Sequence, residues 1–164
     1  MYSLFPVPRQ IRYKTKQTRL TYSSLTLFTN CPQLADRFLQ SLSIQNVEVV
    51  TLAHAEDDVF FIRFGAEQVL DCPDQQQGFS LSIGYDSVLL SSRSEQGLFY
   101  GCLAWNQLAE QGKEAGYIQA LELTDWPVLE NRGLMLDISR GRVYTLDYLK
   151  QLTAKLAMLR INVL

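Results

Sequence analysis

The sequence has few of the residues that most often carry catalysis or bind metals. Its 164 residues include a single histidine, His54. A zinc site, or a Ser–His or Cys–His catalytic pair, would have to be built on His54 alone. Its polar surroundings (53–58) are typical of a solvated turn. We therefore expect no metal site and no cofactor in this chain.

The cysteines are too few and too widely spaced to predict a disulfide framework. Cys31, Cys72 and Cys102 are odd in number and form no C-x-x-C pair. We interpret them as buried free thiols, which are typical of a reducing compartment. Residues 1–8 lack the charged start and long apolar core of a secretory signal, so we expect a cytoplasmic protein.

Long apolar runs and an excess of basic residues are also missing. The densest apolar run, 59–62, is far shorter than the ~18 residues that cross a membrane. Lys and Arg number 15 against 17 Asp and Glu, which gives a net charge of −2 without the basic footprint of a nucleic-acid-binding protein. We expect neither a membrane nor a nucleic-acid partner. At 47% hydrophobic and 20% charged residues, the composition is that of an ordinary folded protein.

Residues 1–124 contain short strand patterns with two helical patterns among them. The clearest strand alternates apolar and polar residues over 79–85, turns at Asp86, and returns over 88–91 as a hairpin. Further strands are predicted at 10–13, 25–28, 47–52, 59–64 and 118–123.

Both predicted helices have an apolar face. The first runs from 32 to about 42. The second follows a capping box formed by Ser92 and Glu95, and its Gly97 and Gly101 would let the backbone approach the sheet closely. These patterns predict an α+β domain in which a mixed or antiparallel sheet has two helices packed on one face.

Residues 125–164 predict the start of a second domain. The segment 134–138 is apolar on both faces, as in a parallel strand covered on both sides. Thr145 is a good N-cap for an amphipathic helix, and 161–164 begins another apolar strand. Strand, helix and strand form the opening unit of a parallel α/β structure, and we place the domain boundary at 124–127.

The stretch 132–140, Arg-Gly-Leu-Met-Leu-Asp-Ile-Ser-Arg, is introduced by Asp-Trp-Pro at 125–127. It resembles the start of the catalytic (β/α)8 barrel of glycoside hydrolase family 20, the β-N-acetylhexosaminidases. The likeness continues over 146–164, and 78–108 resembles the end of the non-catalytic α+β domain that precedes this barrel. The resemblance implies an accessory domain over 1–124 and an incomplete first βα unit of the barrel over 125–164.

The resemblance also implies a carbohydrate substrate. We call the full-length enzyme of which this chain would be a part the parent. The parent would remove terminal N-acetylhexosamine with retention of configuration, with the substrate's own acetamido oxygen as nucleophile and an adjacent Asp-Glu pair assisting it. After residue 132 the only acids are Asp137 and Asp147, so this pair is absent. We expect no catalytic residue here and an inactive fragment.

Arg132 is the one substrate-binding residue that the resemblance implies, as a clamp on sugar hydroxyls. Its structural alternative is an ion pair with Glu130 or Asp137. For Asp137 and Arg140, a buried ion pair at the barrel rim is the favoured interpretation.

Several alternatives stay open. Trp126 is either a sugar platform or an interface anchor; Arg142 and Tyr144 are weaker candidates. The chain is alternatively a complete non-enzymatic binding or scaffolding module, or part of a barrel glycosidase for another sugar. Exposed apolar surface on 126–164 predicts self-association.

Overall fold

The computed structural model describes residues 2–52, 59–65, 72–141 and 143–164. The chain divides into two compact units, 1–126 and 127–164, and each is described by itself. The predicted turn around His54 lies outside the described residues.

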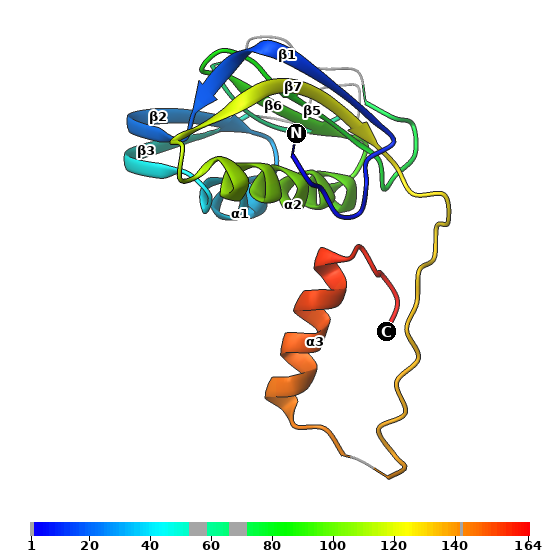
Figure 1. The fold of residues 1–164 in the computed structure, drawn as a ribbon. Helices are drawn as coiled ribbons and strands as arrows, with labels where there is room; N and C mark the ends of the chain where they lie inside the picture. The colour runs from blue at the N-terminus through cyan, green and yellow to red at the C-terminus, as the bar shows by residue number, and fades with distance from the viewer. Residues whose placement is uncertain (1, 53–58, 66–71, 142) are drawn as a thin grey trace. The chain divides into compact units, whose positions relative to one another are not determined.

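The first unit is built on one mixed sheet (Figure 1). Its order is β1-β7-β5-β6-β4-β2-β3, in which β2 and β3 are parallel and the other pairs antiparallel. The predicted α+β class is confirmed. The strands are β1 (Gln10–Arg19), β2 (Thr21–Thr29), β3 (Ser43–Thr51), β4 (Phe60–Phe64), β5 (Phe79–Ile83), β6 (Val88–Ser92) and β7 (Tyr117–Asp125).

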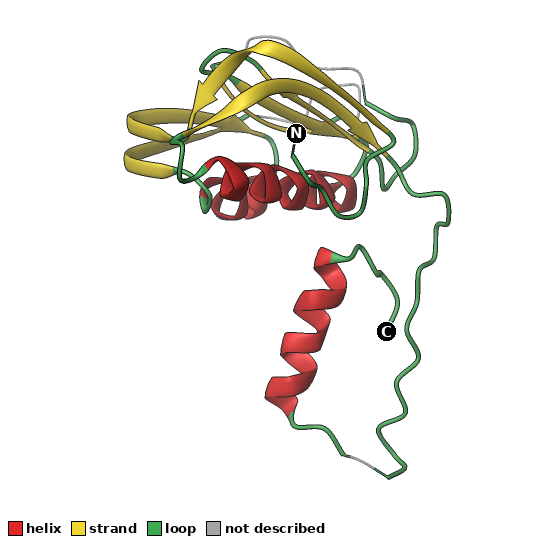
Figure 2. Cartoon of the chain, in the orientation of Figure 1, coloured by secondary structure: helices red, strands yellow, loops and turns green. Residues whose placement is uncertain are grey.

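Both helices of this unit pack on one face of the sheet (Figure 2). They are α1 (Ala35–Leu39), entered through the 3-10 turn η1 (Pro32–Leu34), and α2 (Glu95–Gly112). The first helix is shorter than the predicted 32–42. The fully buried Trp105 of α2 stacks on Phe38 of α1 at 5.2 Å between centroids. Its indole N–H donates to the Phe38 carbonyl at 3.0 Å, so the ring is buried without an unmet donor.

The two glycines at the start of α2 allow the close approach to the sheet that was predicted. A Cβ at Gly97 would lie 2.1 Å from the Ser92 hydroxyl and 2.3 Å from the Gly78 carbonyl. A Cβ at Gly101 would lie 2.2 Å from a methyl of Leu90. A larger residue at Gly97 would require the sheet or the helix to move, and one at Gly101 would require the buried Leu90 side chain to shift.

The predicted capping box at the start of α2 is wrong. The N-cap is Ser94, whose hydroxyl accepts from the Gly97 N–H at 3.0 Å. Ser92 cannot cap the helix because it is the last residue of β6, where its hydroxyl donates to the Gly78 carbonyl at 2.6 Å.

An N-terminal segment is held along α2 by two glutamines one helical turn apart. The Gln107 side chain exchanges hydrogen bonds with the backbone of Phe5, at 2.9 and 2.8 Å. Gln111 does the same with Ser3, at 2.8 and 2.7 Å. Each side-chain amide thus makes the two hydrogen bonds that a neighbouring strand would make, and satisfies one N–H and one carbonyl of the segment.

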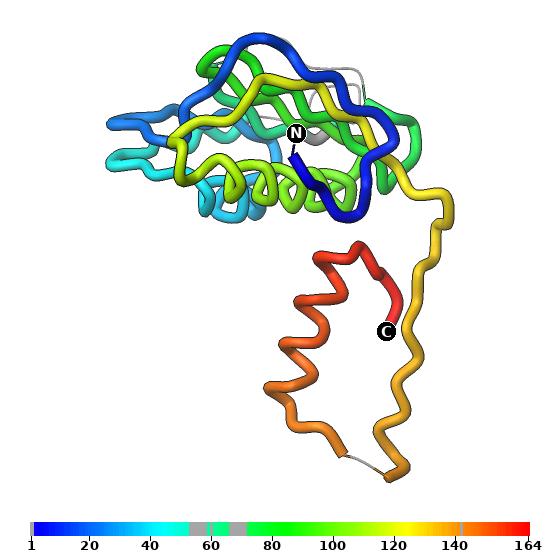
Figure 3. Tube along the Cα trace, in the orientation of Figure 1, coloured from blue at the N-terminus to red at the C-terminus, as the bar shows by residue number. Residues whose placement is uncertain are grey.

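The second unit consists of an extended segment, α3 (Leu146–Met158) and a short return (Figure 3). Thr145 caps α3 as predicted, accepting from the Tyr148 N–H at 3.3 Å. The helix ends in a Schellman turn: the Arg160 N–H donates to the Ala157 carbonyl and the Ile161 N–H to the Leu156 carbonyl, both at 2.9 Å. Arg160 holds the left-handed conformation there, with φ of 57°.

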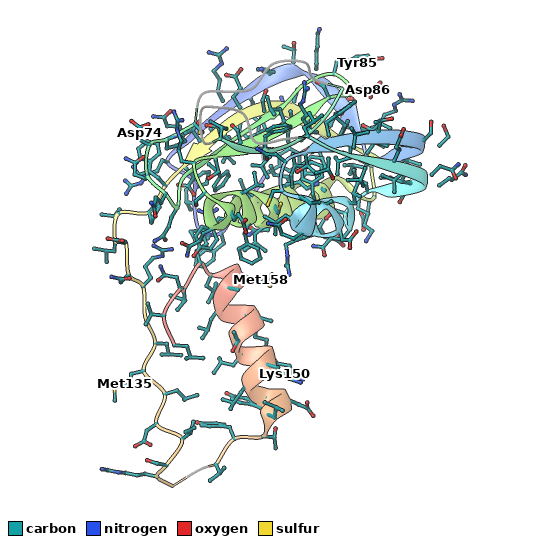
Figure 4. All side chains as sticks on the ribbon, turned by 180° about the vertical axis from the view of Figure 1, so that it is seen from behind. Asp74, Tyr85, Asp86, Met135, Lys150 and Met158 are labelled. Atoms are coloured by element: carbon teal, nitrogen blue, oxygen red, sulfur yellow. The ribbon has the colours of Figure 1, made fainter. Side chains whose placement is uncertain are left out.

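The predicted buried strand at 134–138 does not form in this chain. Among the described residues of this unit, strand pairing is limited to one parallel bridge, between Gly133 and Val163. Leu134 and Ile138 are exposed, and Met135 is 94% exposed (Figure 4). A segment that is apolar on both faces needs neighbours on both sides to be buried, and these residues have too few.

We predict that Gly97→Ala destabilises the first unit. Alanine favours a helix by about 1 kcal/mol over glycine, but the added methyl overlaps the Gly78 carbonyl, and overpacking costs about 1–3 kcal/mol. We therefore expect a net loss in the free energy of unfolding, measured by urea denaturation. Glu110→Ala, on an exposed position of the same helix, should change it by less than about 0.5 kcal/mol. Equal stability of Gly97→Ala and the unmutated chain would contradict the close approach.

Candidate functional site

Arg132 lies where the two ends of the second unit meet. Its carbonyl accepts from the N–H groups of Asn162 and Val163, at 2.9 and 3.3 Å. Its own N–H donates to the Asn162 side chain at 2.8 Å, and the Asn162 amide donates to the Glu130 carbonyl at 2.8 Å. The backbone at Arg132 is therefore fixed by the segment that follows α3.

The Arg132 guanidinium binds main-chain carbonyls. Its Nε donates to the Arg160 carbonyl at 2.7 Å, and Nη1 donates to the carbonyls of Leu129 and Glu130. The Arg160 carbonyl belongs to the left-handed turn that ends α3, so Arg132 bridges that turn and the segment before the bridge. These contacts give Arg132 a structural role through the backbone. The alternative of an ion pair with Glu130 or Asp137 stays a prediction.

Asp137 and Arg140 are brought together on the loop that precedes α3. The Arg140 Nε lies 3.9 Å from the Asp137 Oδ2, with 90% of the arginine side chain and 49% of the aspartate side chain exposed. The pair is thus present but exposed, and the expectation that it is buried is not met in this chain. An exposed pair of this length contributes little stability.

Ser139 is the closer partner of Asp137. Its N–H and its hydroxyl both donate to Asp137 Oδ1, at 2.8 and 2.7 Å. The Ser139 hydroxyl, then its N–H, lower the pKa of Asp137 because both stabilise the charged carboxylate. These bonds stabilise the loop above the usual pKa of an aspartate, and that contribution is lost as the pH falls through the lowered pKa. Sequence reasoning missed Ser139, although a serine two residues after an aspartate is a familiar turn signal.

The aromatic candidates have protein partners. The Arg9 guanidinium lies 5.9 Å from the Trp126 ring centroid, and the Arg9 N–H donates to the buried Asp125 carboxylate at 3.1 Å. The contact with Arg9 anchors Trp126 to the start of the chain. Tyr144 stacks on Tyr148 of α3 at 4.8 Å between centroids. Arg142 lies outside the described residues.

The three cysteines are buried and none forms a disulfide within the described part of the chain. Burial raises the pKa of Cys31 to about 11 and that of Cys102 to about 12, which keeps both as unreactive thiols near neutral pH. Over the described ranges, no group of three or more His, Cys, Asp or Glu residues is arranged to hold a metal ion. Nor does any helix in the described part of the chain have the length and apolarity needed to span a membrane.

Comparison with known proteins gives one family match and many related structures. The model of glycosyl hydrolase family 20, domain 2, matches residues 1–126. No curated protein matches the sequence.

Similar solved structures include β-N-acetylhexosaminidase from Bacteroides fragilis NCTC 9343, with a TM-score of 0.69 and 16% identity over 97% of this chain and 32% of that one. Flavobacterium johnsoniae chitobiase has a TM-score of 0.66 and 18% identity over 97% of this chain and 26% of its own. A protein named CpGH84D has a TM-score of 0.75 and 16% identity over 99% of this chain and 30% of its own. At these identities the likeness shows the fold alone, and the chain spans about a third or less of each relative.

We predict that Arg132→Ala loosens the return after α3. Loss of the guanidinium removes the bonds to the carbonyls of Arg160 and Leu129, and one such bond is worth about 1 kcal/mol or more. Amide hydrogen exchange of Asn162 and Leu134, whose N–H groups close the bridge, should be faster by about tenfold. Arg140→Ala removes an equally basic but exposed side chain and should leave both rates unchanged. Unaltered exchange in Arg132→Ala would contradict the structural role.

We also predict that Ser139→Ala raises the pKa of Asp137 toward its usual value. The variant loses the hydroxyl donor and keeps the N–H donor, so the rise should be partial. The measurement is an NMR titration of the Asp137 carboxyl carbon. Arg140→Ala should move this pKa less; the reverse order would show that the ion pair, and not Ser139, sets the pKa.

Proposed function

The chain belongs to glycosyl hydrolase family 20, and from this premise we propose that it is the N-terminal part of a β-N-acetylhexosaminidase-like glycoside hydrolase. The observation that carries the proposal is the match of the family's domain 2 to the whole first unit, residues 1–126. The first unit is then an accessory domain that braces the catalytic domain.

In this proposal the second unit is the start of a (β/α)8 barrel. Two features support it: Gly133 and Val163 pair in parallel across the intervening α3, as consecutive barrel strands do, and the segment 134–138 is apolar on both faces. In the barrel, Leu134, Met135 and Ile138 would be covered by the neighbouring strands and helices. In the 164-residue chain their exposure favours self-association through 126–164.

The proposed reaction of the parent is hydrolysis of a terminal N-acetylhexosamine with retention. The acetamido oxygen of the substrate attacks the anomeric carbon, and the bond to the leaving oxygen breaks as a glutamic acid protonates that oxygen. An adjacent aspartate orients the acetamido group. Neither residue of this pair is found after Arg132, where the acids are Asp137 and Asp147. We therefore propose that the 164-residue chain has no hydrolase activity of its own.

Arg132 is the residue proposed to bind the terminal sugar. A planar guanidinium with five donors can hold two adjacent hydroxyls while it keeps a main-chain contact. Its bonds to carbonyls on both sides of the bridge fix its orientation. Asp137 and Arg140 would frame the barrel rim beside it.

The test is an assay of the full-length parent with the 4-nitrophenyl β-glycosides of N-acetylglucosamine and of glucose. Hydrolysis of the first and not the second is expected, because glucose carries no acetamido nucleophile. Cleavage of the glucoside alone would contradict the proposal. Hydrolysis by the 164-residue chain would contradict the proposal that the catalytic Asp-Glu pair lies outside this chain.

In the parent, Arg132→Lys should lower kcat/KM by about 10- to 100-fold, because the variant loses one or two hydrogen bonds from a charged donor to the sugar. Arg140→Lys is the matched control and should retain activity. An Arg132→Lys parent with unchanged kcat/KM would remove Arg132 from the sugar site and leave it a structural residue.

A further inference from the structure

Two adjoining hollows open at the edge of the sheet formed by β1. The larger measures about 500 Å³ and is lined by β1 (12–16), Ala120 of β7, and Gly84 and Tyr85 of the β5–β6 turn. The second, about 480 Å³, is formed by 15–17 of β1 together with Tyr85. Tyr85 is therefore common to both, and we refer to the two together as the β1 hollow.

The β1 hollow lies on the face of the sheet that the helices leave uncovered. Leu121 and Leu123 of β7 belong to the buried core on the helix side, so the alternating Glu122 points to the opposite face. Its carboxylate pairs with Lys14 of the hollow at 2.7 Å. Figure 4 shows Tyr85 and Asp86 on this same side, away from α1 and α2.

A bulge in β1 forms one wall of the hollow. Tyr13 pairs with Leu121 and Gln17 with Gln119, so four steps along β1 oppose two steps along β7. The extra residues lift 14–16 out of the regular ladder, and the Gln119 side chain donates to the Lys14 carbonyl at 2.8 Å to fill the gap. Bulges of this kind change the direction in which side chains project, and here they affect Lys14, Thr15 and Lys16.

The opposite wall is held in place by an ion pair. Asp86 accepts from Nε and Nη2 of Arg19, at 3.1 and 2.8 Å. This fork ties the β5–β6 turn to the end of β1. Tyr85, the residue before Asp86, is 70% exposed, so the hollow has an accessible aromatic ring beside the bulge.

The hollow is positively charged. Three basic side chains line it, Arg12, Lys14 and Lys16, while Glu122 is shared between Lys14 and Arg12, the latter at 3.7 Å. In the described part of the chain, Lys16 has no acidic side chain within ion-pair distance. An anionic group entering the hollow would therefore meet an excess of positive charge.

We propose that the β1 hollow is a second, non-catalytic binding site for an acidic saccharide. The pyranose ring would stack on Tyr85, its carboxylate would pair with Lys16 and Lys14, and Thr15 and Gln17 would bind its hydroxyls. Small residues at Gly84 and Ala120 leave space for one sugar ring. This site does not depend on the hydrolase activity proposed above, and it adds a binding function to the accessory domain.

A saccharide fits the hollow better than a nucleic acid does. Single-stranded nucleic acids are bound by several aromatic side chains along a basic groove. The hollow offers the ring of Tyr85, whereas Tyr13 packs against the buried core on the other face of the sheet, opposite Leu121.

The test measures binding of the 164-residue chain by isothermal titration calorimetry. The probe is a tetrasaccharide that alternates glucuronic acid with N-acetylglucosamine, and the neutral reference is the N-acetylglucosamine tetrasaccharide. We expect the acidic probe to bind at least tenfold more tightly and to weaken with added salt. Tyr85→Ala and Lys16→Glu should each weaken it by about tenfold, whereas Tyr85→Phe should retain it because the ring remains.

Lys150→Glu, on α3 of the second unit, is the matched control: it makes the same charge change outside the hollow and should leave the affinity unchanged. Equal affinity for the two tetrasaccharides would overturn the proposal, as would equal weakening by Lys150→Glu and Lys16→Glu. Tighter binding of an oligothymidylate of the same charge would show that the hollow binds a nucleic acid and would overturn the saccharide proposal. Because these outcomes are read as binding, they are separate from the glycoside assay of the parent.

Discussion

The packing of α2 against the sheet is the contact on which the first unit depends. Cross-strand pairing aligns four buried residues in one row over β7, β5, β6 and β4: Leu123, Leu81, Leu90 and Ile62. Gly101 lies directly against Leu90 of this row. A one-residue slip of any strand would turn its apolar side chains to the other face, so this row sets the register of the sheet as well as the depth of the helix.

The second unit is held by a different kind of interaction. It buries little, with Leu156 as the buried apolar residue of α3, and polar contacts to the backbone take the place of a core. Arg132 and Asn162 join the segment before the bridge to the turn after α3. Hydrogen bonds contribute about 1 kcal/mol each, much less than a buried core, so these residues can set the geometry of the unit but add little to its stability.

The sequence predicted those parts of the fold whose residues have one buried face. Residues 79–85 alternate apolar and polar side chains, 88–91 follow the turn as the return of a hairpin, and α2 and α3 have apolar stripes, so the positions of these elements could be predicted directly. The outer half of β1 (14–19) was missed because an edge strand with polar side chains on both faces has no periodic signal. The cap of α2 was misassigned because Ser92 and Ser94 are both suitable residues, and only the structure shows that the Ser92 hydroxyl is used by Gly78. Arg132 was identified through the family resemblance, but its carbonyl partners carry no residue signature and were not predictable.

The division of the sheet into two faces also explains where a domain of this fold can acquire functions. The helix face is fully occupied by the core, and a change there alters packing that several strands share. The opposite face carries polar pairs such as Ser80 with Thr124, whose hydroxyls lie 3.4 Å apart. Over β4 to β6 this face is also buried, as at Phe61 and Leu89, but toward β1 it is exposed, as at Arg12, and substitutions there cost little stability. The bulge in β1 lies on this face, where it can present Lys14 and Lys16 without disturbing the contact with α2.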